Sequence, residues 1–375
     1  MGAGVSAETP ANTVLPLLEL AASGAGVSGA MHLGAELESA GYFDSGLVGQ
    51  WQMIHDLLWQ RLAEQKDCAK TIQQLASYPE AKIRFYMPGV WARWGVDRPQ
   101  AALDAILPLA ADADFRVLES SQAFGIRPFA QKLGPGILEM LAPWFQHADP
   151  RVRRAAMTAV RPRGFWVKNL EWAVEQPGYL VPILESFREE EDRFPANAVA
   201  NCCNDISRRQ PLLALSLLGR WMEQGGGPQT EHMARKGLRS MSKAGDPRVL
   251  ELFGFGKLDL AVKAKLRQGE IVAPNTNLCF ELQVHNLGPS CQAELVYELE
   301  STGRIAGRPR RKRYQGGRFE LEAAQQTEIL VRERIFDRKA ALLIDGAAAA
   351  NFLINGELVA RVDFAIERET NSLNA

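Results

Sequence analysis

Basic side chains gather in three segments of a chain that is neutral overall. The 375 residues carry 43 Lys and Arg against 44 Asp and Glu, so the formal net charge is −1 and gives no nucleic-acid signature by itself. The first segment holds six basic residues and no acidic one: Arg151, Arg153, Arg154, Arg161, Arg163 and Lys168. The second holds Arg235, Lys236, Arg239 and Lys243, and the third holds Arg304, Arg308, Arg310, Arg311, Lys312, Arg313 and Arg318.

Clustered basic residues suit contact with phosphates, because neutralised phosphates release counterions and this release drives binding. The alternative for each segment is a solvated surface, balanced elsewhere by acidic runs such as Glu189–Asp192. Three such segments in one neutral chain favour a polyanionic ligand. The run Arg310–Arg313 is predicted to lie in an exposed turn between strands, since burying four unpaired charges would be costly.

Cysteine and histidine spacing argues against a metal site or another bound cofactor. The five cysteines form no C-x-x-C pair, and the five histidines are scattered. An odd number of cysteines in a long chain indicates free thiols in a reducing cytoplasm. No apolar run reaches the roughly 18 residues that span a membrane.

The first two thirds of the sequence predict helices. Segments 51–63, 99–111 and 137–145 carry apolar residues at three- and four-residue spacing. The stretch from Asp114 leads into Arg127-Pro128, and the stretch from Asp149 leads into Arg161-Pro162. Looser copies follow from Asp192 and near Thr230. A period of about 35–45 residues is typical of helix-pair repeats that stack into a solenoid with a concave face.

After residue 256 the pattern changes to short strands. Leu278, Phe280, Leu282 and Val284 alternate with other residues, which predicts a strand. Asn355-Gly356 lies between two further apolar stretches and predicts a tight hairpin turn. Strands at this spacing in about 100 residues suggest an immunoglobulin-like (Ig-like) β-sandwich.

The predicted fold is therefore mainly α: a HEAT-like solenoid followed by a small all-β Ig-like sandwich. We expect a flexible tail over residues 1–30, the solenoid over 31–256, a linker over 257–267 and the sandwich over 268–375. We expect the protein to be a monomer.

Four ordered motifs carry a family resemblance. Ala123–Phe129 resembles the "EFAIRPF" element of AlkC-type alkylpurine DNA glycosylases, and Arg161–Trp166 is similar to their "RPRLPW". Val199–Ser207 matches their "VANxxNDIS" helix, and the stretch from Leu238 to Phe255 is similar to their last helical repeat. The resemblance covers roughly residues 85–256, and the strand region parallels the Ig-like domain that many AlkC/AlkD-family members append.

The resemblance implies a monofunctional glycosylase that removes cationic bases, such as 3-methyladenine, from duplex DNA bound along the solenoid. Trp166 falls at the position of the aromatic group that faces the cationic base, and Asp205 at that of the carboxylate near the sugar. DNA phosphates are then the expected ligands of the basic segments. The residues expected to bind them are Arg153, Arg154, Arg161, Arg163, Lys168, Arg235, Lys236, Arg239, Arg310, Arg311, Lys312 and Arg313.

One position departs from the family pattern. Ala123 stands where "EFAIRPF" begins with a glutamate, a suspected second active-site carboxylate. Glu119 lies one helical turn earlier and is the reserve candidate, or an ordinary surface acid. A single remaining acid would leave a slow glycosylase, one with altered base preference, or a DNA-structure-binding protein without catalysis. A HEAT-type protein-interaction scaffold is the remaining alternative.

Overall fold

The computed structural model describes residue 19 and residues 33–164, 166–301, 309–335 and 346–367. Apart from residue 19, the tail predicted over residues 1–30 lies outside the described residues. The chain forms two compact units, Met1–Gly237 and Leu238–Ala375. The described part of the chain contains no helix long and apolar enough to cross a membrane.

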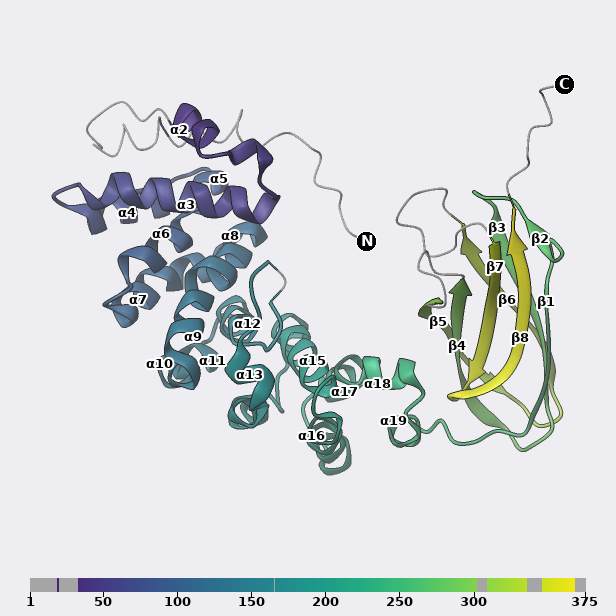
Figure 1. Cartoon of the computed structure of the whole chain (residues 1–375). Coiled ribbons are helices and arrows are strands. Elements are labelled where there is room, and N and C mark those ends of the chain that lie inside the picture. The colour runs from purple at the N-terminus through teal and green to yellow at the C-terminus, as the bar shows by residue number, and fades with distance from the viewer. Residues whose placement is uncertain (1–18, 20–32, 165, 302–308, 336–345, 368–375) are drawn as a thin grey trace, which may run out of the picture. The chain divides into compact units, whose positions relative to one another are not determined.

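In its described residues the first unit consists of helices joined by loops, and Figure 1 shows the helices stacked in chain order. Its elements are α2 (Leu33–Ser39), η1 (Tyr42–Asp44), α3 (Leu47–Ala63), α4 (Cys68–Ala76), α5 (Ala81–Arg84), α6 (Met87–Trp94), α7 (Pro99–Ala110), α8 (Phe115–Ser120), η2 (Ser121–Ile126), α9 (Arg127–Leu133), η3 (Gly134–Gly136), α10 (Ile137–Met140), α11 (Ala142–Phe145), α12 (Pro150–Ala159), α13 (Glu171–Glu175), η4 (Pro177–Leu180), α14 (Val181–Ser186), α15 (Arg193–Ser207), α16 (Pro211–Gln224) and α17 (Thr230–Gly237). The predicted helices over 51–63 and 99–111 are confirmed. The one over 137–145 is interrupted at Leu141, because Pro143 has no N–H for a continuous helix.

The aspartates that begin the repeated sequence stretches lie where helices begin. Asp114, Asp149 and Asp192 are the N-caps of α8, α12 and α15. Each side chain accepts a hydrogen bond from the backbone N–H two residues later, at 2.9, 2.8 and 2.7 Å. These bonds satisfy N–H groups that the first helical turn cannot satisfy itself. The repeated aspartate therefore sets where successive repeat helices begin.

Helix α15 lies at the centre of the packing that positions the candidate site. It packs against α12 on one side and against α17 and α16 on others. Val199, Cys202 and Cys203 are fully buried in this contact. Gly237 permits the close approach of α17, since a Cβ there would lie 2.8 Å from Leu218 Cδ1 and 3.0 Å from Cys203 Cβ.

The "EFAIRPF"-like motif adopts an unusual helical form. Residues Ser121–Ile126 make the π-helical turn η2, between α8 and α9. Pro128 lacks an N–H and its ring clashes with the carbonyl four residues earlier, so a regular α-helix cannot pass through this segment. The turn is buried throughout, including Gln122 and Ala123.

The second unit begins with α18 (Arg239–Ala244) and α19 (Pro247–Leu252) and continues as eight described strands. The strands are β1 (Leu260–Leu266), β2 (Ile271–Val272), β3 (Asn277–Asn286), β4 (Cys291–Ser301), β5 (Arg310–Leu321), β6 (Gln326–Arg334), β7 (Gly346–Ile354) and β8 (Glu357–Ile366). They form one sheet in the order β1-β3-β6 and another in the order β2-β8-β7-β4-β5. The change from helix to strand falls near residue 256, between α19 and β1. The linker predicted over 257–267 is wrong, because β1 occupies most of it and pairs with β3. The two compact units divide earlier, after Gly237.

The two sheets share one hydrophobic core. Phe280 of β3 lies edge-on to Phe352 of β7, with ring centroids 5.4 Å apart, and also contacts Phe364 of β8. The predicted hairpin is confirmed: Asn355 and Gly356 join β7 to β8 with φ angles of 47° and 81°. Two positive φ angles in a two-residue turn are the reason for the Asn-Gly pair.

The predicted basic turn is wrong. Arg310–Arg313 form the start of strand β5, at the edge of the five-stranded sheet, and pair with β4. The cost of burying four charges excludes a buried position for this segment. It does not distinguish a turn from an exposed edge strand, because charged side chains are equally well solvated in both.

Helices α18 and α19 pack against the strands of their own unit. Ser242 donates a 2.8 Å hydrogen bond to the buried carboxylate of Glu294 on β4. Arg313 of β5 donates to the Lys243 carbonyl at 2.9 Å. Gly356 lies so close to α18 that a Cβ would meet the Gly245 carbonyl at 3.0 Å. The last helical repeat is thus an integral part of the β-containing unit.

Candidate active site

A buried arginine organises the loop that carries most of the candidate residues. The Arg127 side chain is 1% exposed and donates to four backbone carbonyls, those of Ala159, Arg161, Pro162 and Lys168, at 2.8–3.3 Å. Burial, together with the nearby Arg161, lowers the pKa of Arg127 to about 10, so the guanidinium stays charged at neutral pH. This single side chain holds the loop 160–170, which follows α12, against the start of α9.

The loop presents Arg161 to Asp205 of α15. Arg161 Nε and Nη2 donate to the same carboxylate oxygen, Asp205 Oδ2, at 3.0 and 2.8 Å. The Asp205 side chain is 5% exposed and the Arg161 side chain 17% exposed. Oδ1 accepts no hydrogen bond from any described residue. The ion pair therefore fixes the carboxylate and leaves one oxygen for another partner.

Asp205 lies in the wall of a pocket of about 400 Å³. The pocket combines guanidinium groups, an amide and apolar side chains, and its lining residues are Pro162, Arg163, Asn169, Ala173, Val174, Asp205, Ile206, Arg208 and Arg209. Among the described residues, neither Trp166 nor Glu119 lines it. The structure thus joins Asp205 with basic residues rather than with the other two candidates in this cavity.

Trp166 belongs to an aromatic cluster on a different set of helices. Its ring lies 5.4 Å from that of Trp51 of α3, at 73°. Trp51 in turn contacts Phe85 and Phe124 edge-on, at 5.2 and 5.8 Å. Trp51 and Trp166 are both half-buried, so the cluster keeps an accessible aromatic edge.

Glu119 is held by Arg154. Arg154 Nη2 lies 3.3 Å from Glu119 Oε1, and the guanidinium stacks 4.3 Å from the ring centroid of Phe194. Burial lowers the pKa of Arg154, and the Glu119 carboxylate opposes this shift. Ala123, at the family's glutamate position, is buried in η2.

The remaining basic residues near this loop differ in their partners. Arg153 forms two bonds with Glu190, at 2.7 and 2.9 Å, and further bonds with backbone carbonyls, so it ties adjacent repeats together. Arg163 and Lys168 are exposed, and no described residue pairs with their side chains. The charges of both side chains are therefore accessible to solvent.

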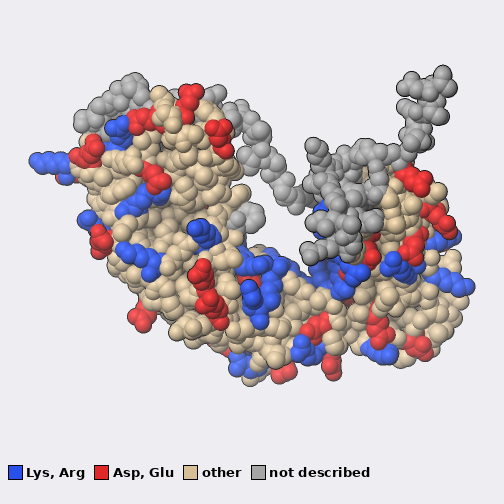
Figure 2. Space-filling view, in the orientation of Figure 1, with Lys and Arg blue, Asp and Glu red and all other residues tan. Residues whose placement is uncertain are grey.

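The second basic segment spans two elements. On α17, Arg235 pairs with Glu231 at 2.7 Å and Lys236 donates to Asn197. Arg239 is half-buried at the start of α18. Figure 2 shows Lys and Arg side chains gathered over α15 and α17 on the viewed face.

The third segment is largely paired within the sheet. Arg311 and Arg313 each form a 2.8 Å ion pair with a glutamate of β4, Glu300 and Glu298. Lys312 lies 4.8 Å from the ring centroid of Tyr314. Arg310 is exposed and also has an interaction partner.

Two pocket residues were missed in the sequence. Arg208 and Arg209 follow Asp205 by three and four residues, a spacing that places side chains on the same helical face. That spacing is the signal in the sequence that places the pair near Asp205. In the described part of the chain, no group of three or more His, Cys, Asp or Glu side chains could hold a metal ion.

Similarity to solved structures identifies the fold. AlkC from Pseudomonas fluorescens, an alkylpurine DNA glycosylase solved with DNA containing an abasic-site analogue, matches 94% of this chain and 97% of its own, at a TM-score of 0.78 and 21% identity. The chain has the AlkC fold. The resemblance inferred from the motifs is thereby confirmed in structure, and the AlkC match extends over both compact units.

Other comparisons are more limited. AlkD2 from Streptococcus mutans matches 55% of this chain and 95% of its own, at 17% identity and a TM-score of 0.44. The uncharacterized protein YhaZ of Bacillus subtilis (strain 168) is 32% identical over 140 residues. That stretch is 37% of this chain and spans 39% of the length of YhaZ. No protein-family model matches the chain.

Proposed function

We propose that this protein is a monofunctional DNA glycosylase that hydrolyses the N-glycosidic bond of cationic alkylated bases, of the 3-methyladenine type, in duplex DNA. The observation that carries the proposal is the Asp205 carboxylate, which Arg161 fixes through Oδ2 while no described residue bonds Oδ1, in the wall of an arginine-lined pocket. The AlkC fold and the DNA bound to AlkC support a DNA ligand.

Asp205 would act on the sugar. When the bond between C1′ and the base nitrogen breaks, its electron pair neutralises the departing cationic base, so a strong general acid is not required. Positive charge then develops on the sugar, where a fixed carboxylate stabilises it. Water adds its oxygen to C1′, and Asp205 Oδ1 is available to orient the water and take its proton.

The aromatic cluster would act on the base. The half-buried indoles of Trp51 and Trp166 offer ring faces and edges to a methylated purine. Contact between an indole and a cation is worth about 0.5–2 kcal/mol, which favours a charged lesion over a neutral base. Arg127 supports this role indirectly, because it holds the loop from which Trp166 projects.

Release of free methylated bases from alkylated duplex DNA tests the proposal. Asp205→Asn should lower the rate of base release by at least roughly tenfold, the loss expected for one electrostatic stabiliser of the transition state, with little change in DNA affinity. Asp97→Asn is the matched control, since the Asp97 side chain is 94% exposed. Equal rates for Asp205→Asn and the wild type would remove Asp205 from the mechanism.

A second candidate is a DNA-structure-binding protein without catalysis. It is favoured by Ala123, which lacks the family carboxylate, and by Glu119, which is engaged by Arg154. Duplex binding without base release from any methylated substrate would support it. Ala123→Glu should restore or raise base release in either case, provided that thermal melting shows no overpacking of the buried η2 turn.

The arrangement of helices and strands supports a more specific fold assignment for each of the two regions. We propose that the first region is a HEAT-like solenoid, because capped helices recur along it and pack in chain order. The two-sheet region is proposed to be an Ig-like domain, because antiparallel strands in two sheets enclose one core.

A further inference from the structure

The pocket beside Asp205 carries more positive charge than the proposed chemistry requires. Three arginines, Arg163, Arg208 and Arg209, line it together with a single carboxylate. That carboxylate is already paired with Arg161, so the side chains around the pocket carry a net positive charge. A cationic base would be repelled by such a pocket, and an anion would be attracted.

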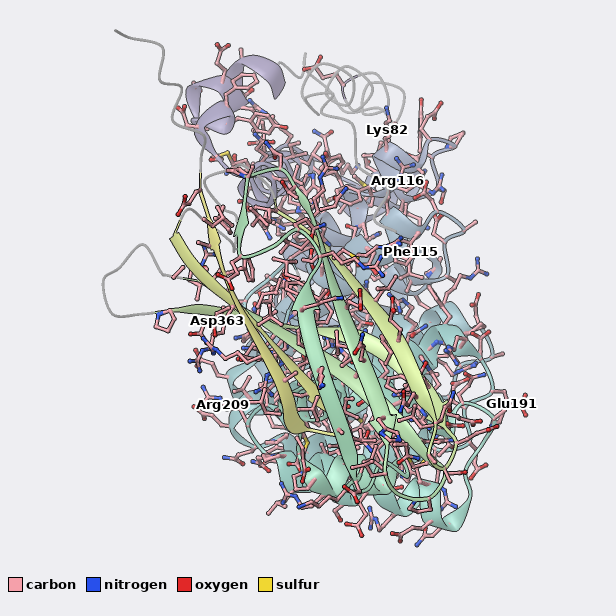
Figure 3. All side chains as sticks on the ribbon, turned by 90° about the vertical axis from the view of Figure 1, so that its right-hand side faces the viewer. Lys82, Phe115, Arg116, Glu191, Arg209 and Asp363 are labelled. Atoms are coloured by element: carbon pink, nitrogen blue, oxygen red, sulfur yellow. The ribbon has the colours of Figure 1, made fainter. Side chains whose placement is uncertain are left out.

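The arginines of the pocket are available to a ligand. All three are exposed, and among the described residues none forms an ion pair or side-chain hydrogen bond with them. The acidic run of this unit lies elsewhere: Figure 3 shows Glu191 and Arg209 at opposite margins of the view. Exposed acids do lie on α13, at Glu171 and Glu175, but among the described residues neither pairs with the three arginines, so the guanidinium groups are not held by a carboxylate of the protein.

The end of α15 and the turn after Ser207 set the spacing between the Asp205 carboxylate and two of the guanidinium groups. Arg208 and Arg209 follow Asp205 by three and four residues, and one helical turn advances about 5.4 Å. Backbone bonds from Arg209 and Gln210 to the Ile206 carbonyl close this last turn. A sugar and an adjoining phosphate on a DNA strand are separated by a similar distance.

We propose that this pocket binds a backbone phosphate adjoining the sugar that faces Asp205. This inference rests on the proposed function. Guanidinium forks bind phosphate oxygens through paired, charge-assisted hydrogen bonds, and Asn169 adds an amide donor. The apolar lining of Pro162, Ala173 and Ile206 suits the carbon atoms of a deoxyribose. Binding that phosphate would hold the target nucleotide with its sugar facing the Asp205 carboxylate.

The test combines a charge-neutralising variant with charge-neutralised DNA. The full-length protein and its Arg208→Gln/Arg209→Gln variant are titrated against a duplex that contains one stable abasic analogue. In separate duplexes, one phosphate at a time around the analogue is replaced by an uncharged methylphosphonate. Lys70→Gln/Lys82→Gln is the control, because it removes the same charge from exposed residues of the same unit that have no described partners.

We expect wild-type affinity to fall roughly tenfold at one or two phosphate positions next to the abasic analogue. The Arg208→Gln/Arg209→Gln variant should bind the unmodified duplex with a similar loss and should be insensitive to methylphosphonate at those positions. The Lys70→Gln/Lys82→Gln control should retain the wild-type pattern.

Additive losses at every position, or equal behaviour of the two variants, would overturn the phosphate site. If base release is nevertheless observed, the proposed function survives that failure. Tight binding of free deoxyribose 5-phosphate by the wild type, with additive losses on duplex DNA, would assign the pocket to a small phosphate ester instead. Absence of duplex binding would overturn the phosphate site and the proposed function together.

Discussion

The loop 160–170 and the strand β5 are both rich in basic residues, but their side chains differ in how many form ion pairs with acids of the protein. In the loop, Arg163 and Lys168 extend from a backbone that Arg127 holds in place, without described ion-pair partners. In β5, Arg311 and Arg313 face glutamates of β4 across the sheet. The sequence shows how many basic residues a segment contains. Pairing with neighbouring acids in the folded protein decides which of those residues are accessible to a ligand.

The two regions differ because a strand has a hydrogen-bonded partner strand and a loop does not. A strand places side chains opposite those of its partner at fixed register, so alternating glutamates on β4 meet alternating arginines on β5. A loop fixed through its carbonyl groups leaves its side chains free of such register. We therefore expect the loop to contribute more to DNA affinity and β5 to contribute more to the cohesion of its own unit.

The largest expected effect comes from removing the support of the loop. Arg127→Met leaves four buried carbonyl groups without their charged donor and should lower the free energy of unfolding by roughly 3 kcal/mol or more. Arg311→Met is the comparison variant and should cost about 0–1 kcal/mol, since its side chain is 57% exposed. Urea denaturation measures both, and equal losses would contradict the distinction between the two regions.

A smaller effect is expected when matched pairs of basic residues are neutralised. Arg163→Gln/Lys168→Gln should weaken binding to any duplex sequence, because phosphate contacts carry no base information. The slope of log affinity against log salt should become shallower by about 0.9 for each phosphate that the variant no longer neutralises.

The matched variant in the strand is Arg311→Gln/Arg313→Gln. We expect a smaller change in salt slope, because these side chains already neutralise Glu300 and Glu298. A salt slope that changes more in this variant than in Arg163→Gln/Lys168→Gln would reverse our ranking and make β5 the principal phosphate-binding element.

The smallest effect concerns arginines that are paired within their own helix turn. Hydrogen bonds from Arg116 and Arg151 lower the pKa of the capping residues Asp114 and Asp149 below the ordinary value of 3.8. A lowered folded-state pKa stabilises the fold above pH 3.8 and loses that contribution as the pH falls through the folded value.

Asp114→Asn/Asp149→Asn keeps a capping oxygen but removes the charge. We expect it to reduce the free energy of unfolding by about 1 kcal/mol at pH 6 and by less near pH 2, where the carboxylates begin to protonate in the folded state as well. Denaturation at both pH values measures this difference. A difference that persists unchanged at pH 2 would show that the loss comes from the cap geometry and not from the charge.

Local patterns in the sequence sufficed for much of the fold. Apolar spacing predicted α3 and α7, the repeated aspartates marked successive helix starts, and Asn355-Gly356 predicted its hairpin. The ordered motifs pointed to AlkC, and the structure has that fold. These features depend on a few neighbouring residues, so the sequence alone determines them.

Long-range packing decided what the sequence could not. The contacts between Arg127 and the loop, between Arg161 and Asp205, and between β5 and β4 each join residues far apart in the chain. The pairing of Glu119 with Arg154 depends in the same way on how α8 meets α12. Whether a charged side chain is held in an ion pair or open to a ligand is set by such neighbours. Only the tertiary structure brings them together.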